Sequence, residues 1–173
     1  MRKLIRNSLI VSAVAVASAT ASVGKVHAQT ADIDFNGTVG KTCSITKNGD
    51  GKIGVSDNND SILTSRPDES SQGSLTTVTV NCNGSGVISV SPLTPVSTDA
   101  IALSQKSGYY AGAELYNDAN AASLLTTTST TINPNGTPKE VYVHAFARDN
   151  TNGGTTIPTG TYSFRTKVSV TPQ

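Results

Sequence analysis

The feature that most constrains this fold is an alternating stretch near the end of the sequence. From Tyr162 to Val170, bulky or apolar residues at every second position alternate with polar or basic ones. Successive side chains of a β-strand point to opposite faces, so the pattern predicts a strand with one apolar face and one wet, basic face. Gly160, shortly after Pro158, marks its beginning. Such a strand needs sheet neighbours from far upstream, and Glu140 to Arg148 is the neighbour that we expect.

The first 28 residues have the layout of a secretory signal peptide. A basic start at Arg2, Lys3 and Arg6 precedes an apolar run, and small residues end at Ala28. The run is too short and too interrupted by Ser and Thr to favour a membrane span, although an uncleaved anchor is the alternative. No later stretch is apolar enough to cross a bilayer. We therefore expect residues 1–28 to be a cleaved signal and residues 29–173 to form a single secreted domain.

Cleavage changes the charge of the chain. Four of the 13 Lys and Arg residues lie in the signal, but none of the 12 Asp and Glu residues does. The remaining chain then carries nine basic and twelve acidic side chains, a formal net charge of −3. This balance does not attract a phosphate backbone, so we expect no nucleic-acid partner.

Two cysteines, Cys43 and Cys82, lie in the exported part. Exported proteins form disulfides, so the sequence predicts one bond between them, worth about 4 kcal/mol in the chain-entropy model. Two free buried thiols are the alternative.

The rest of the chain predicts further strands and no strongly amphipathic helix. Strands are expected near residues 33–45, 53–55, 75–82, 87–91, 101–104, 113–116, 124–132 and 140–148, the last of these central. A turn at residues 47–52 is expected to join two antiparallel strands, and residues 57–73 are expected to be mostly loop. Eight or nine short strands at such spacing predict an all-β fold, a β-sandwich.

Catalytic and metal chemistry find little support. His144 is the only histidine left after cleavage and lies within a predicted strand, without a nucleophile elbow elsewhere. We expect no enzyme, no cofactor and no zinc site, since one histidine and two distant cysteines lack ligand spacing. Residues 46–57 overlap partly with a calcium loop, but Thr46 replaces its first carboxylate and Asp57 its last Glu. A plain turn is the preferred interpretation of that segment.

Glycans are a further ligand to consider. Tyr109, Tyr110 and Tyr116 are the aromatic residues on which a sugar would stack, and core or rim packing is the favoured alternative.

Several motifs, in order, resemble the chaperone–usher pilus subunit superfamily, and in particular its spore-coat-protein-U-like branch. Phe35-x-Gly37-x-Val39-x-x-x-Cys43 is similar to the first strand of those pilins, and Cys82 ends a Val/Thr strand as their second cysteine does. Residues 113–121 are similar to their mid-chain strand and turn. Residues 140–148, a polar loop and the end strand from Gly160 resemble the coat-protein branch.

The resemblance implies an immunoglobulin-like sandwich that lacks its final strand. A periplasmic chaperone, and later the next subunit, would fill the open groove by β-augmentation. It implies Ile33, Phe35 and Val39 as donor-strand residues. The strand bordering the groove would contribute the following residues: Gly160, Tyr162, Phe164, Val168 and Val170.

Two functions follow. The first is a secreted, non-enzymatic structural subunit of a cell-surface pilus (fimbrium) or coat, with other subunits, a chaperone and an outer-membrane usher as partners. The second is a self-complete binding module, either a carbohydrate-binding adhesin or a calcium-dependent surface domain. Only six residues, 29–34, precede Phe35, so the segment Ile33 to Val39 is either donated to the next subunit or part of a complete domain.

Overall fold

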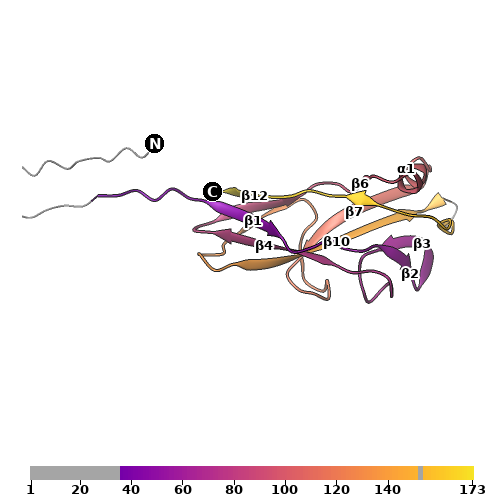
Figure 1. Ribbon diagram of the computed structural model, residues 1–173, viewed down its shortest axis with the longest axis horizontal. Helices are drawn as coiled ribbons and strands as arrows, with labels where there is room; N and C mark the ends of the chain where they lie inside the picture. Colours follow the sequence, from indigo (N-terminus) through magenta and orange to yellow (C-terminus); the bar gives the residue numbers. More distant parts are fainter. Residues whose placement is uncertain (1–35, 152–153) are drawn as a thin grey trace, which may run out of the picture. The chain divides into compact units, whose positions relative to one another are not determined.

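The computed structural model describes residues 36–151 and 154–173, and the fold is that of the compact unit Thr38–Gln173. The described residues form twelve strands and one short helix, which confirms the all-β prediction (Figure 1). Eight of these strands have four residues or more, and the others have two or three. They assemble into curled sheets packed as a β-sandwich.

The larger sheet has seven strands arranged around one long central strand. Its path runs β1-β4-β10-β3-β2, and β7 and β8 extend it beyond the other edge of β10. The bounds are β1 (Cys43–Lys47), β2 (Gly54–Ser56), β3 (Asn59–Thr64), β4 (Thr76–Cys82), β7 (Tyr109–Tyr116), β8 (Leu124–Thr126) and β10 (Lys139–Asp149). Antiparallel pairing joins β10 to β4 and β3 along one edge and to β7 along the other. The central position expected for residues 140–148 is confirmed.

The second layer holds the end of the chain. β12 (Val168–Pro172) pairs with β5 (Gly86–Val90), which also pairs with β9 (Ser129–Ile132). β11 (Phe164–Arg165) pairs with β6 (Thr94–Pro95). The expectation that the closing strand lies beside residues 140–148 is wrong. Both edges of β10 are occupied by other strands, so the C-terminal segment pairs in the opposite layer.

The core lies between the two layers and continues towards the helix. Val80, Ile88, Leu115 and Val141 have no exposed surface and come from both layers. A smaller cluster at one end joins Leu63, Leu103, Ala147 and Ile157. Burying such side chains stabilises the fold by roughly 1.5–3 kcal/mol each.

The strand expected at residues 101–104 is wrong, because α1 (Thr98–Ser104) is a helix. The Ser97 side chain accepts a hydrogen bond from the Ala100 backbone N–H, an N-cap interaction. Ala100 and Leu103, three positions apart, are the helix residues that face the core. A cap and an i, i+3 pair are weak sequence signals in a helix of only seven residues.

Residues 57–73 contain a full strand, β3, where mostly loop was expected. Its buried residues include Ser61 and Thr64 beside Leu63. Hydrogen bonds satisfy the polar pair: Ser61 bonds to the Asn59 side chain, and the Thr64 hydroxyl lies 3.1 Å from His144 Nε2. Leu63 faces the core, whereas Thr64 lies on the outer face with His144. Apolar alternation does not detect a strand whose other buried residues carry hydroxyl groups.

Candidate functional site

Strand edges that lack a partner face each other along one side of the sandwich. β1 pairs only with β4, while β12 pairs only with β5 and β11 only with β6. β1 lies beside β12, yet no ladder joins the two within the described part of the chain (Figure 1). We call this boundary between β1, with its continuation to Ile53, and residues 162–172 the seam.

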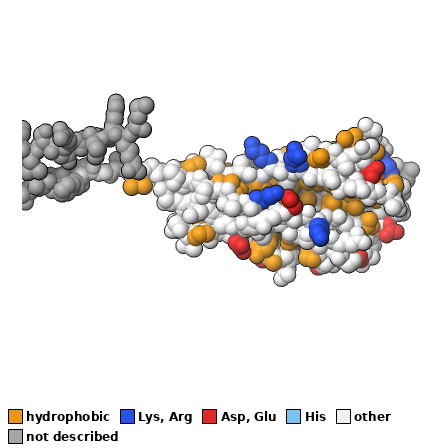
Figure 2. All heavy atoms as spheres, viewed as in Figure 1, with side chains coloured by type: hydrophobic (Ala, Val, Ile, Leu, Met, Phe, Trp, Pro, Cys, Tyr) orange, Lys and Arg blue, Asp and Glu red, His pale blue; other side chains and the backbone are white. Residues whose placement is uncertain are grey.

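The seam opens into a groove at the end away from the disulfide. The groove has a volume of about 1150 Å³, and residues 47–53 and 162–166 line it from the two sides. Leu93, Val143 and Ala145 contribute apolar surface between these segments. Figure 2 shows hydrophobic side chains in a band along the middle of this face, with Lys and Arg side chains beside it. The edge of the core therefore lines the groove, with Leu93 8% and Val143 5% exposed.

Side chains along the seam are less covered than those of the inner strands. Ile45 on one side and Phe164, Val168 and Val170 on the other pack against the core but stay only half-buried. Val80 on the inner strand β4 has no exposed surface. An apolar row that stays half-exposed beside an unpaired edge is the surface that an added strand would cover.

One wall of the groove is formed by the glycine-rich stretch at residues 48–51. It does not form the expected turn between paired strands, so that prediction is wrong. The Asn48 N–H donates to the Thr77 carbonyl, and Lys52 forms a bridge with Ser74, so the chain continues irregularly along β4. A Cβ on Gly51 would lie 3.0 Å from the Ser74 carbonyl oxygen. Glycine here permits a close approach of backbone to backbone rather than a reversal of direction.

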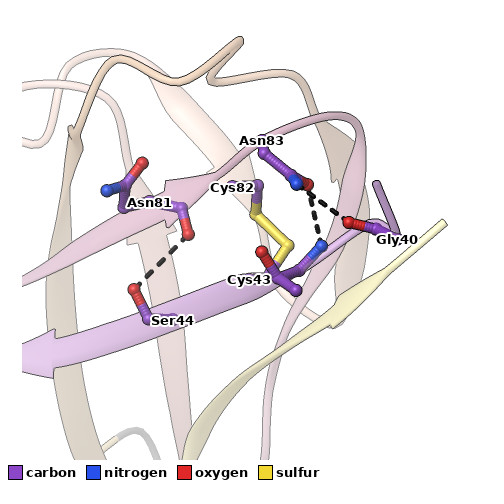
Figure 3. The surroundings of a disulfide bond; sticks show 7 residues. Gly40, Cys43, Ser44, Asn81, Cys82 and Asn83 are labelled. Atoms are coloured by element: carbon purple, nitrogen blue, oxygen red, sulfur yellow. Dashed lines mark hydrogen bonds between the residues drawn. A yellow bond between two sulfur atoms is a disulfide. The ribbon is translucent and has the colours of Figure 1, made fainter. Parts of the chain in front are cut away.

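The predicted disulfide, which the structure confirms, lies at the other end of the seam, where the two layers pack closely. The Cys43–Cys82 bond joins β1 to β4, and Cys82 is 1% exposed (Figure 3). A Cβ on Gly86 of β5 would lie 2.9 Å from Cys43 Sγ and 3.2 Å from the Thr171 carbonyl oxygen of β12. Both layers therefore meet at the disulfide, and only a glycine fits between them.

Asn83 fixes the chain that enters β1. Its side-chain oxygen accepts from the Thr42 N–H at 2.8 Å, and its side-chain nitrogen donates to the Gly40 carbonyl at 2.9 Å (Figure 3). Its own N–H donates to the Thr42 carbonyl at 3.1 Å. Residues 38–42 are exposed throughout, and Val39 is 86% exposed. We call these three hydrogen bonds of Asn83 the clamp. It holds residues 40–42 at the point where an exposed segment enters β1.

The residues predicted for the groove are divided by the structure. Tyr162 and Phe164 line it. Val168 and Val170 pack on the core nearer the disulfide. Gly160 lies beside the helix, where a Cβ would meet Asp99 Oδ2 at 2.6 Å. Of the donor residues, Ile33 and Phe35 lie outside the described residues.

His144 lies on the outer face of the larger sheet, away from the seam. It is 5% exposed, with Nδ1 3.1 Å from Glu114 Oε2 and Nε2 3.1 Å from Thr64 Oγ1. Burial lowers the pKa of His144, although the Glu114 carboxylate opposes this shift. Burial also raises the pKa of Tyr116 to about 12, aided by its hydrogen bond to Glu114. Both ring nitrogens of His144 are engaged, so the histidine has a structural part in this network.

The residues considered for calcium and sugar binding have other contacts. Lys47 Nζ lies 2.6 Å from Asp50 Oδ1, and the Asn48 amide donates to the Thr77 and Thr79 hydroxyls. The structure groups no metal-binding set of three or more His, Cys, Asp or Glu side chains within residues 36–151 and 154–173. Tyr116 is buried, and Tyr110, 51% exposed, packs against Phe146 and Arg148.

No protein-family model and no curated protein matches this sequence. Within the described residues, no helix has the length and apolar character needed to cross a membrane.

Sequence reasoning missed most of the groove. It did not identify Leu93, Ala145, Lys52 or Ile53 as site residues. The alternation at residues 140–148 placed Val143 and Ala145 on one face, but nothing in that pattern shows which part of a core face stays uncovered. That information depends on how the two layers pack over this face.

Proposed function

We propose that this protein is a secreted, non-enzymatic structural subunit of a cell-surface pilus or coat. It assembles by donor-strand-type β-augmentation, in which an extended segment of another chain enters the groove. The observation that carries the proposal is the combination of an apolar floor, at Leu93, Val143 and Ala145, with unpaired strand edges on both sides.

Two kinds of interaction are unmet at the groove: backbone hydrogen bonds at strand edges and burial of apolar side chains. The unpaired edges of β11 and of β1 at Lys47, the β1 residue that lines the groove, offer backbone N–H and C=O groups to an incoming strand. Main-chain hydrogen bonds would supply affinity. The half-buried Phe164 and the groove floor offer apolar surface to alternate side chains of that strand. Each large apolar side chain buried there would contribute roughly 1.5–3 kcal/mol. A groove that combines both fits a strand better than it fits a compact ligand.

The partners follow from the resemblance to chaperone–usher pilins. A periplasmic chaperone would protect the groove after export, an outer-membrane usher would mediate assembly, and another subunit would complete the sandwich. An exposed edge beside an apolar row is a hazard for aggregation, which explains why such a subunit needs a chaperone. The place of action would be the periplasm and then the cell surface.

The test is the behaviour of the exported chain, beginning at Gln29, when it is produced without a chaperone. We expect oligomers that survive detergent at room temperature and dissociate on heating, detected by gel filtration and electrophoresis. Ala145→Arg, which places a long charged side chain in the groove, should abolish them. The control Tyr110→Arg changes the exposed outer face and should leave them intact. A sharp monomer with reversible melting would contradict the proposal and favour the self-complete binding module.

A further inference from the structure

We propose that the basic rim of the groove forms ion pairs with acidic residues in the segment before β1. Residues 29–39 of a second copy then bind in one register. This inference rests on the function proposed above and adds to it how the register of the incoming segment is set.

The rim carries more positive than negative charge. Lys47, Lys52 and Arg165 line the groove, and Asp50 is the acidic residue among its described lining. Lys47 already holds Asp50 at 2.6 Å. Lys52 and Arg165 have no carboxylate within ion-pair distance in the part of the chain that the structure describes. Two cations on opposite walls are therefore available to a ligand.

The segment before β1 has the complementary pattern. Residues 29–39 read Gln-Thr-Ala-Asp-Ile-Asp-Phe-Asn-Gly-Thr-Val, with two acidic residues and no Lys or Arg. In an extended strand, Ile33 and Phe35 share one face while Asp32 and Asp34 share the other, about 6.6 Å apart. When the apolar face enters the groove, the carboxylates remain at its mouth, beside the basic rim.

The charges distinguish between strand registers that the apolar pattern leaves equivalent. A slip of one residue would turn Ile33 and Phe35 away from the floor, so alternation excludes it. A slip of two residues restores the same face and is not excluded by alternation alone. It moves the pair Asp32 and Asp34 along the rim, away from Lys52 and Arg165. The rim thus favours one register among those that the apolar side chains permit.

The geometry at Asn83 points to a second copy as the source of the segment. Asn83 holds both Gly40 and Thr42, and the exposed residues 38–42 precede β1 at the disulfide end. The groove lies at the other end, beside residues 47–53. To fill its own groove, the chain would have to reverse direction within the few residues that Asn83 fixes. Donation to another molecule needs no such reversal.

The experiment measures self-association of the chain from Gln29 by analytical ultracentrifugation, at about 0.05 M and about 0.5 M salt. The arm variant carries Asp32→Lys and Asp34→Lys, and the rim variant carries Lys52→Glu and Arg165→Glu. A third chain combines all four substitutions. Lys139→Glu, a reversal outside the groove lining, is the control.

We expect association to weaken about tenfold in the arm variant and in the rim variant, and to recover in the combined chain. Wild-type association should weaken at high salt, while Lys139→Glu should behave like the wild type. Association that is unaffected by the reversals or by salt would overturn the charge inference and leave strand addition intact. A wild-type monomer would overturn both proposals. A monomer destabilised by deleting residues 29–38 would show that the chain fills its own groove, which overturns the assignment to a second copy.

Discussion

The two ends of the seam differ in how closely the two layers of the sandwich pack against each other. At one end, Gly86 of β5 packs against the Cys43–Cys82 bond of the larger sheet, so the two layers meet without a gap. At the other end, residues 47–53 and 162–166 stay apart, and Leu93, Val143 and Ala145 line the groove between them. The two layers can therefore pack fully against each other, as they do at the disulfide end. Close packing around Gly86 leaves no opening at the disulfide end, so the groove is confined to the other end.

The largest effect should come from breaking the closed end. Cys43→Ser together with Cys82→Ser should lower the free energy of unfolding by about 4 kcal/mol, because the unfolded chain regains loop entropy. Urea unfolding followed by circular dichroism measures it. Wild type unfolded under reducing conditions should show the same midpoint as the double variant. A loss below about 1 kcal/mol would mean that the disulfide contributes little to the stability of the fold.

A core substitution and a groove substitution should then separate stability from assembly. Leu115→Ala, at a site without exposed surface, should cost about 3 kcal/mol in unfolding free energy. Phe164→Ala, at a half-buried site, should cost about 1.5 kcal/mol in the unassembled chain but abolish self-association. Calorimetry and ultracentrifugation measure the two properties. If Phe164→Ala associates normally, the groove does not take part in assembly.

A smaller effect is expected at the clamp. Asn83→Ala removes two exposed side-chain hydrogen bonds, so the unfolding free energy should fall by about 1 kcal/mol. Hydrogen exchange at the Thr42 amide should accelerate as well. The matched control is Asn81→Ala, an exposed asparagine two positions earlier on β4. Equal effects at both positions would show that Asn83 has no special part in directing the segment.

The smallest effect is a pH dependence in the larger sheet, away from the seam. Burial lowers the folded-state pKa of His144 below its usual value near 6.5, so folding favours the neutral ring. The unfolded chain therefore binds more protons as pH falls below about 6.5, and stability falls there by at most about 1.4 kcal/mol per pH unit. His144→Gln should flatten the profile between about pH 6.5 and pH 5 when unfolding is measured at each pH. An unchanged profile would mean that other groups dominate.

Sequence reasoning predicted local features better than boundaries between elements. The disulfide follows from two cysteines in a chain predicted to be exported. The single strand predicted from Tyr162 to Val170 is divided in the structure into β11 and β12, which belong to different sheets. The partner of that strand was wrong, because alternation identifies a buried face but does not say which edge meets which. The stretch at residues 48–51 was mistaken for a turn, since glycine serves reversals and irregular edge strands equally well.

The candidate site shows the same limit. Tyr162 and Phe164 were placed at a groove through the resemblance, and the structure places both in the lining. Lys52 and Arg165 carried no signal, because an isolated basic residue usually means only a solvated face. Their significance comes from lying on two segments that are more than a hundred positions apart in sequence and line one groove.

The central claim is that the groove takes an extended segment from a second copy. Its most direct test is disulfide cross-linking between two chains, one carrying Ile33→Cys and the other Ala145→Cys at the groove floor. The account predicts a mixed dimer under mild oxidation, and no dimer when Ala145→Cys is replaced by Tyr110→Cys on the outer face. Absence of the mixed dimer, or a monomeric chain that carries both substitutions and links only to itself, would contradict it.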